Sequence, residues 1–319
     1  MKYVVICTIF ISCNSMAKQI SIKIMSYNVE NLFDSSHDPN KTDWEYLPLA
    51  SKYHSYIKEN CRRIYSQYYR KKCISRDWSH KIVKNKVLNL SKVINSSPVG
   101  PDIIFLSEVE NHTTLNWLNN TLLFPLKTMI LIEGRDRRGI DPAIISRYHL
   151  ISAYLSNIPF TGIKNIITRQ LLISSLKVRS YSVAAISLHL PSQAKPFTYR
   201  SQAIQWLNHQ AKTLKKTHDL VIAAGDFNLT NTEYRRLRKS IARHWETTYK
   251  LGARKGTYYY KKKRQWSYFD MIWLLKNPFC SLDEKSVEIL SVGKAFPKRF
   301  DGESGSSDHF PVTATISCS

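Results

Sequence analysis

Short apolar runs that adjoin acidic, amide or histidine side chains recur along this chain of 319 residues, and they restrict its possible folds more than any other feature. The clearest run, residues 220–224, is apolar at every position, which is typical of a strand buried on both faces. Gly225 ends the run and allows another segment to approach closely. Asp226 and Asn228 follow, two residues apart. Taken alone, this segment could equally be a β-turn, because glycine, aspartate and asparagine all favour turns.

Five further segments share this pattern, in which a side chain able to bind a metal or transfer a proton adjoins or interrupts an apolar run. The run at 22–27 precedes Asn28 and Glu30, the run at 102–107 precedes Glu108, the run at 182–188 precedes His189, Asp270 lies within the run at 268–273, and Asp308 and His309 precede the run at 310–316. Because α/β folds place their chemistry at the carboxyl ends of buried strands, this recurrence favours a functional site over a set of turns.

The segments SYNVEN, SEVEN, SLHLPSQ, GDFN, SYFDMIW and SSDHFP together resemble the endonuclease/exonuclease/phosphatase superfamily of DNase I-like enzymes, and within it the bacterial-type exported nucleases. They follow the order of the family and cover almost all of the chain after residue 17. The resemblance implies a four-layer α/β sandwich, in which two mixed β-sheets pack face to face with helices outside. Alternating strand and helix patterns favour an α/β fold on their own.

The first 17 residues have the features of a secretory signal peptide. Lys2 precedes an apolar stretch at 3–12 that is too short to span a bilayer, and residues 15–17 offer a small-x-small cleavage site. A buried N-terminal strand is one alternative. Lipoprotein processing at Cys13 is a weaker one, because Phe10 fits that signal poorly. We therefore expect an exported protein, periplasmic or secreted.

Residues 18–319 are expected to form a single domain, because the apolar strands are evenly spread and no linker rich in proline, glycine and serine separates two halves. A basic, tyrosine-rich insertion interrupts this domain at residues 35–80. No segment after the signal peptide is long and apolar enough to be an integral membrane segment, and we expect a monomer.

Residues 80–95 carry apolar side chains at helical spacing and are predicted to form an amphipathic helix. Helices are also predicted at 115–123, 199–214 and 235–243. The outer face of the first helix is expected to be merely solvated, and it carries Lys81, Lys84, Lys86 and Lys92.

Four cysteines lie outside the signal peptide, which permits three disulfide pairings in an oxidising compartment. We favour Cys61–Cys73 and Cys280–Cys318, because the members of each pair are near one another in sequence or near the same end. None of the four has metal-ligand spacing.

The chain carries 47 lysines and arginines against 24 acidic residues, a net charge of +23. Such a charge predicts a polyanionic partner, namely nucleic acid, acidic polysaccharide or an anionic membrane surface. Basic and aromatic residues are interleaved at 61–76 and 254–266, which suits a phosphate backbone with stacked bases. In the second stretch we expect phosphate contacts from Lys261, Lys262, Lys263 and Arg264, and base stacking by Trp266 or the tyrosines at 258–260.

The resemblance implies a divalent-metal site. Glu108 corresponds to the metal-binding glutamate of the superfamily, Asn28 and Glu30 complete the site, and Asp308 lies at its edge. Hard cations prefer oxygen ligands, so Mg²⁺ is expected and Mn²⁺ or Ca²⁺ would also fit. Without the other motifs, Glu108 would be interpreted as a solvated charge at a strand end.

The resemblance also implies catalytic roles. His309 is the expected general base or transition-state donor, oriented by Asp270. Asp226 could instead orient or deprotonate the water, with Asn228 donating to a phosphate oxygen, and the sequence does not decide between Asp226 and His309. His189 corresponds to a phosphate contact or general acid. Weaker support on the phosphate side is expected from two residues, Asp141 and Arg147.

These features together predict a metal-dependent phosphodiesterase that hydrolyses nucleic acid, with DNA favoured over RNA: an exported DNA endonuclease. Because one constellation serves several substrates, a sphingomyelinase-like or small phosphoester hydrolase of the same fold is the alternative. A lipid enzyme would more naturally carry an apolar hairpin for membrane entry, and the sequence shows no such run. A non-catalytic polyanion-binding protein is the third possibility, disfavoured because each expected catalytic position is filled.

Overall fold

The computed structural model describes residues 20–162 and 168–319, so the predicted signal peptide lies outside the described residues. Within these ranges the strands form two six-stranded sheets and a small hairpin. The first sheet has the order β13 (Cys280–Ile289), β14 (Val312–Cys318), β1 (Ile20–Leu32), β2 (Ile103–Val109), β4 (Asp141–Ser146) and β3 (Thr128–Leu131). The second has the order β5 (His149–Ser156), β6 (Leu171–Val178), β7 (Tyr181–His189), β8 (Leu220–Asp226), β12 (Asp270–Leu275) and β9 (Trp245–Thr247). The hairpin pairs β10 (Tyr258–Tyr260) with β11 (Gln265–Ser267).

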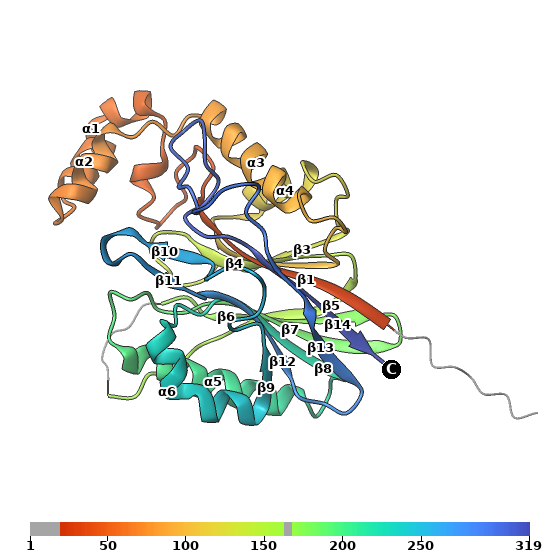
Figure 1. Cartoon of the computed structure of the whole chain (residues 1–319). Coiled ribbons are helices and arrows are strands. Elements are labelled where there is room, and N and C mark those ends of the chain that lie inside the picture. The colour runs from red at the N-terminus through yellow and green to blue at the C-terminus, as the bar shows by residue number, and fades with distance from the viewer. Residues whose placement is uncertain (1–19, 163–167) are drawn as a thin grey trace, which may run out of the picture.

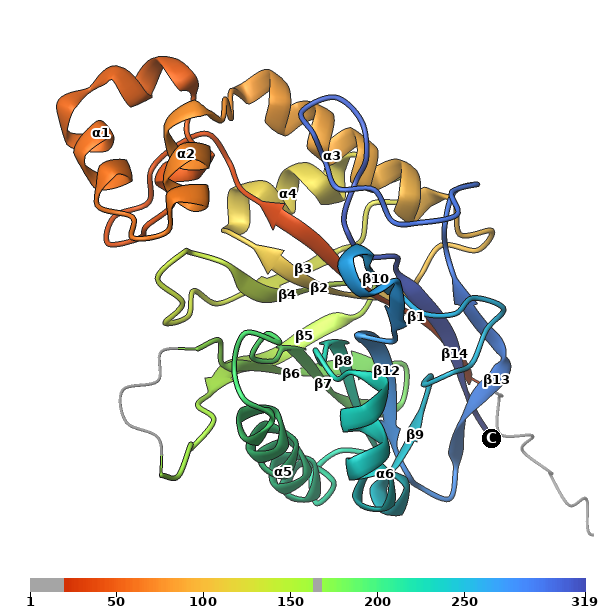
Figure 2. The same cartoon turned by 60° about the vertical axis from the view of Figure 1, so that its left-hand side comes forward.

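Helices cover the outer faces of both sheets, which confirms the predicted four-layer α/β sandwich (Figures 1 and 2). Helices α3 (His80–Asn95) and α4 (His112–Asn120) lie over the first sheet, and α5 (Phe197–Leu214) and α6 (Asn231–His244) lie over the second. Among the residues described, none of the helices combines the length and the apolar character that crossing a bilayer requires.

The central strands are buried on both faces, as their unbroken apolar runs predict. On β1, Ile24 packs into the apolar cluster shared with the second sheet, whereas its neighbour Met25 packs into the cluster shared with α3 and α4. Hydrogen bonds also cross between the sheets. The Ser107 hydroxyl donates to the carbonyl of Leu188 (3.1 Å), and the Ser187 hydroxyl donates to that of Ala143 (3.2 Å).

Strand direction brings the predicted polar residues to one edge of the sandwich. β1 runs parallel to β2, and β7 runs parallel to β8. β14 is antiparallel to β1 and β12 is antiparallel to β8, so both begin where their partners end. Asp226, for example, lies opposite both His189 and Asp270 in the register of the second sheet.

Gly225 is required where β8 ends beside β7. Its φ is 142°, and a Cβ placed on it would lie 1.9 Å from the carbonyl oxygen of Leu188. Only glycine therefore allows the chain to place Asp226 beside His189.

The insertion at 35–80 is helical. It contains the 3₁₀ turns η1 (Trp44–Tyr46) and η2 (Leu49–Tyr53), followed by helices α1 (Ser55–Arg62) and α2 (Gln67–Ser75). A small core of its own contains Trp44, Leu47 and the disulfide between Cys61 and Cys73. Figure 1 shows it in orange, beyond the end of α3.

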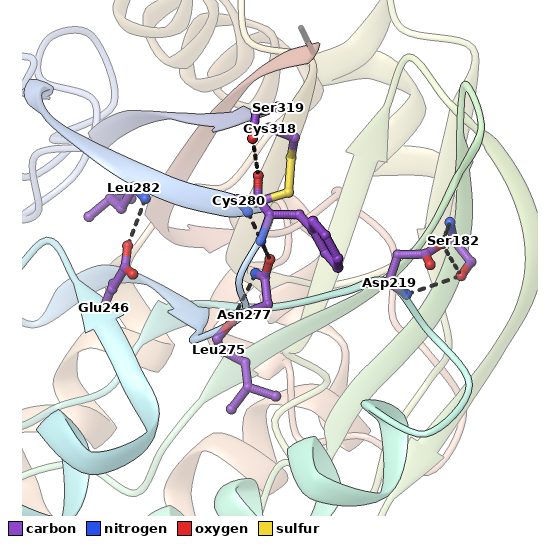
Figure 3. The surroundings of a disulfide bond; sticks show 10 residues. Ser182, Asp219, Glu246, Leu275, Asn277, Cys280, Leu282, Cys318 and Ser319 are labelled. Carbon is purple, nitrogen blue, oxygen red and sulfur yellow. Dashed lines mark hydrogen bonds between the residues drawn. A yellow bond between two sulfur atoms is a disulfide. The ribbon is translucent and has the colours of Figure 1, made fainter. Parts of the chain in front are cut away.

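Both favoured disulfide pairings are confirmed. Cys280 lies opposite Cys318 in the antiparallel register of β13 and β14, with Cα atoms 4.1 Å apart. Figure 3 shows this bond beside Asn277, whose side-chain oxygen accepts a hydrogen bond from the Cys280 amide (2.8 Å). The last strand is therefore fixed covalently to its neighbour.

Replacing Cys280 and Cys318 with serine is expected to lower the free energy of unfolding by up to ~4 kcal/mol, because this bond closes a long loop with a separation of 38 residues. The same substitution of Cys61 and Cys73, separated by 12 residues, should cost up to ~3 kcal/mol. Urea unfolding followed by tryptophan fluorescence measures both. An unfolding midpoint equal to that of the wild type would contradict the stabilising role of the bond concerned.

Candidate active site

A cavity of about 1180 Å³ opens at the edge where β1, β2, β7 and β8 end. Its lining includes eight side chains that the sequence singled out as catalytic or metal-binding: Asn28, Glu30, Glu108, His189, Asp226, Asn228, Asp308 and His309. A ninth, Asp270, is buried and hydrogen-bonded to His309. The strand-end pattern therefore predicted a true cluster.

The backbone adopts the left-handed region at four non-glycine residues around this cavity. Glu30, Asn31, Glu108 and Asn228 have φ values of 49°, 57°, 69° and 50°. The ladder of β1 with β2 and that of β2 with β4 both shift register near these residues, as at β-bulges. Such conformations are costly, collect at functional sites and redirect side chains that a regular strand would turn elsewhere.

His309 is held by Asp270. Its Nδ1 lies 2.6 Å from Asp270 Oδ2. The other oxygen of Asp270 accepts a hydrogen bond from the backbone amide of Asn28 (3.1 Å). Burial by itself would lower the pKa of His309, but the charge of Asp270 and its hydrogen bond, together with Asp308 and Asp226, raise it to about 10. The carboxylates around this imidazole thus favour its cationic, donating form.

Asp226 lies at the centre of the cluster, 1% exposed. Its Oδ2 accepts a hydrogen bond from Asn28 Nδ2 (3.0 Å), and its Oδ1 accepts one from the backbone amide of Asn228 (2.8 Å). Burial raises the pKa of Asp226 to about 7, although His309 acts in the opposite direction. The Asn228 side chain donates one amide hydrogen to the Leu190 carbonyl (3.1 Å) and retains a second.

His189 is buried, with Nε2 3.5 Å from Asp226 Oδ2 and 3.8 Å from Glu108 Oε1. Burial, followed by the positive charges of Arg169 and Arg138, lowers the pKa of His189 well below its ordinary value. The sequence interpretation missed both arginines. Arg169 is itself buried and donates to the His189 carbonyl (3.1 Å). Arg138 lines the cavity from a turn rich in basic residues, and that basic character was the signal by which the sequence could have revealed it.

Glu108 projects between β1 and β2. Its Oε1 accepts from Asn28 Nδ2 (3.3 Å) and its Oε2 from the Asn31 amide (2.9 Å). The Asn28 side-chain oxygen points away from these carboxylates and accepts a hydrogen bond from the backbone amide of Glu30 (2.9 Å). In this arrangement Asn28 orients two carboxylates, Glu108 and Asp226, with its amide nitrogen.

Arg299 lies between the two remaining acids that were predicted to bind metal. Its guanidinium is 3.3 Å from Glu30 Oε1 and also pairs with Asp308. Burial and the charge of Asp308 raise the pKa of Glu30 to about 7, while Lys86 and Arg299 act against them. Arg299 comes from a segment without periodicity between β13 and β14, and the sequence interpretation missed it.

The carboxylates of Glu30, Glu108 and Asp308 therefore line the same cavity, and their chemistry fits a hard divalent cation. Within residues 20–162 and 168–319, no three His, Cys, Asp or Glu side chains converge closely enough to form a metal cage by themselves. Mg²⁺ does not require one, because it commonly binds through one or two carboxylates, retained waters and substrate phosphates. Among the residues that the structure describes, Glu108 pairs with no lysine or arginine and only with His189 (3.8 Å), so it is the best anchor, with Glu30 and Asp308 lining the same cavity.

The prediction that Lys86 lies on a solvated face is wrong. Lys86 is 0% exposed, and its Nζ donates to the Ser306 carbonyl and lies 5.3 Å from the centre of the Phe300 ring. Burial lowers the pKa of Lys86 to about 8, although the charge of Glu30 raises it. The segment between β13 and β14 packs over α3 and buries Lys86. The periodicity of a helix cannot predict burial by a segment that lies elsewhere in the chain.

Arg147 does not reach the site. It pairs with Asp102 (3.1 Å) at the opposite end of β4, so this substrate-binding prediction is corrected. Asp141 is buried beneath the turn that carries Arg138, where it accepts from the Gly134 amide (3.1 Å), and it does not line the cavity. It supports the cavity wall, so this substrate-binding prediction is corrected as well.

The β10–β11 hairpin lies beside the site, as its position before Asp270 predicted. Tyr258 forms an isolated β-bridge with His309, and Tyr260 and Lys263 line the cavity. The other three predicted phosphate contacts are exposed but do not line it: Lys261, Lys262 and Arg264.

Trp266 is half-buried and does not line the cavity. Its ring stacks on Phe296 (centroids 5.6 Å apart) and packs against the main apolar cluster. This prediction is corrected because the apolar side of the hairpin turns inward.

Comparisons with known proteins agree with this architecture. A family model described as "Endonuclease/Exonuclease/phosphatase family" matches residues 23–317. No curated protein matches the sequence. Among solved structures, truncated TDP2 from Caenorhabditis elegans is 15% identical with a TM-score of 0.56, over 93% of this chain and 97% of that one. An endonuclease/exonuclease/phosphatase family protein from Bacteroides thetaiotaomicron is 16% identical with a TM-score of 0.59, over 95% and 99% of the two chains. A mannosyl-6-phosphatase from the same organism is 16% identical with a TM-score of 0.58, over 92% and 99%.

Proposed function

Because this chain belongs to the endonuclease/exonuclease/phosphatase family of phosphoester hydrolases, we propose that it is a divalent-metal-dependent phosphodiesterase that cuts nucleic acid, with DNA as its main substrate. The observation that carries the proposal is the convergence of Glu108, Asp226, His189 and the His309–Asp270 pair on one cavity. These groups supply the anchors, the charge and the proton donors that phosphodiester hydrolysis needs.

The size and charge of the cavity favour a polymer. At about 1180 Å³ it exceeds the roughly 300–1,000 Å³ usual for small-ligand sites. Arg63, Lys72, Arg138 and Lys263 line it from three separate segments, and the whole chain carries a net charge of +23. Polyanions such as DNA are bound largely through such cations.

In this mechanism Asp270 holds His309 so that Nε2 can donate to an oxygen of the phosphate. Asp226 orients the attacking water and accepts its proton, held in place by Asn28 and Asn228. His189, neutral and beside Asp226, contacts a phosphate oxygen. Glu108, with Glu30 and Asp308 alongside, would hold a divalent cation, which would supply charge neutralisation at the phosphate and stabilisation of the leaving oxygen. Mg²⁺ is the proposed ion.

Export is part of the proposal. Two disulfides support it, since such bonds persist in oxidising compartments. Mass spectrometry of the protein purified from its native compartment tests it. The expected result is an N-terminus after Ala17 with no free thiols, and an uncleaved chain with reduced cysteines would contradict export.

One assay tests the activity. Purified protein is incubated with plasmid DNA, RNA, sphingomyelin and a sugar phosphate, each with Mg²⁺ or with EDTA. We expect cleavage of DNA that EDTA abolishes. The resemblance in fold to a mannosyl-6-phosphatase makes a small phosphoester the alternative, and hydrolysis of the sugar phosphate alone would replace the nuclease proposal.

A further inference from the structure

The cavity has two walls that come from segments far apart in the sequence. One is the β10–β11 hairpin, which contributes Tyr260 and Lys263. The other is the α1–α2 helix pair of the insertion, which contributes Asn60, Arg63, Tyr69 and Lys72. Figure 1 shows both elements on the same side of the sheets, away from the C-terminus of the chain. A substrate entering the cavity therefore passes the helix pair as well as the hairpin.

The disulfide of the insertion fixes the two cations of the helical wall relative to each other. Cys61 and Cys73 are both buried, with Cα atoms 5.5 Å apart. Arg63 follows Cys61 by two residues, and Lys72 immediately precedes Cys73. The bond thus joins α1 to α2 at the place where both present a positive charge to the cavity.

Both cations are free to exchange their present partners for phosphate. Within the part of the chain that the structure describes, Arg63 pairs only with Glu59 (3.2 Å), and because the Arg63 side chain is 72% exposed, water weakens this ion pair. Lys72 Nζ lies 4.8 Å from the centre of the Tyr68 ring. Tyr69 is 55% exposed and offers a face on which a base can stack.

We propose that the disulfide-bridged helix pair α1–α2 is a second nucleic-acid contact, which holds the substrate strand from the side opposite the hairpin. Arg63 and Lys72 bind phosphates that flank the scissile one, and Tyr69 stacks on an unpaired base. The inference rests on the proposed function, because it assigns a nucleic-acid strand to the same cavity.

The chain offers a matched control. Arg62, the last residue of α1, and Lys71 of α2 are the sequence neighbours of Arg63 and Lys72, and they are exposed but do not line the cavity. The variants R63Q/K72Q and R62Q/K71Q therefore make the same change of charge at adjacent positions of the same two segments. Binding of a labelled oligonucleotide duplex is measured in EDTA, so that no cleavage occurs, over a range of salt concentrations.

R63Q/K72Q is expected to flatten the slope of log affinity against log salt by up to ~1.8, at ~0.9 for each phosphate that the protein no longer neutralises. R62Q/K71Q is expected to retain the wild-type slope. Equal slopes for the two variants would overturn the assignment of the helix pair. Failure of the wild type to bind or cut any nucleic acid would overturn the proposed function itself, so the two failures are distinguishable.

A second measurement tests the role of the bond. The C61S/C73S variant, with its fold checked by circular dichroism, should also bind the duplex more weakly and with a flatter slope, because Arg63 and Lys72 lose their fixed spacing. Wild-type affinity and slope in this variant would show that the helices alone set that spacing and would refute the role of the disulfide.

Discussion

Glu108→Gln is expected to lower hydrolysis at limiting Mg²⁺ by roughly 100-fold or more, because it removes the anionic oxygen on which a hard cation depends. The fold should persist, since a glutamine carbonyl can still accept from the Asn31 amide as Glu108 does now (2.9 Å). Isothermal titration with Mn²⁺ gives a readout independent of turnover, and we expect binding to weaken in parallel.

Glu45→Gln is the matched control for this change. Glu45 lines the same cavity, and its carboxylate pairs with Arg76 (3.1 Å) and not with any proposed metal ligand. It should retain metal affinity and most of the activity. Near-normal turnover of Glu108→Gln at limiting Mg²⁺ would place the metal elsewhere.

His309→Ala and Asp270→Asn are each expected to reduce turnover by roughly 10²–10⁴-fold. Alanine removes the donor. Asparagine keeps the size of Asp270 but removes the charge that fixes the tautomer of His309 and stabilises its cation across the 2.6 Å contact. Because the two residues act as one unit, the double variant should be little worse than the more impaired single variant.

The test is a double-mutant cycle on kcat at saturating Mg²⁺, with circular dichroism to confirm folding. Mn²⁺ affinity should change little, because Glu108 is untouched. If the two losses multiply, Asp270 and His309 act independently and the proposed pairing is wrong.

Local patterns in the sequence predicted the individual strands and helices, and the family resemblance implied the four-layer sandwich and the candidate site. Helix α3 has the predicted bounds, 80–95, because its apolar residues recur at helical spacing. The convergence of the candidate site residues could be predicted because parallel strands end at a common edge, which gathers residues as distant in sequence as Asn28 and Asp226. The disulfides followed from nearness along the chain.

The errors concern contacts that no local pattern encodes. Lys86 is buried by a segment more than 200 residues later, next to Ser306. Arg147 is close to the site in sequence, but a six-residue strand carries the chain away by roughly 20 Å, at ~3.3 Å per residue. Trp266 faces inward because the hairpin must bury one side, and its sequence does not say which.

The two sheets divide the candidate catalytic groups between them. The first contributes Asn28 and Glu108, the second contributes Asp226 and Asp270, and the 3.0 Å contact of Asn28 with Asp226 joins the halves. A displacement of about 1 Å in such a site can cost on the order of 100-fold in rate. The turnover rate should therefore respond to smaller changes in the packing of the two sheets than the free energy of unfolding does. Substitutions of residues packed between the sheets, such as Ile24, should therefore lower the turnover rate well before they lower the free energy of unfolding to a damaging extent.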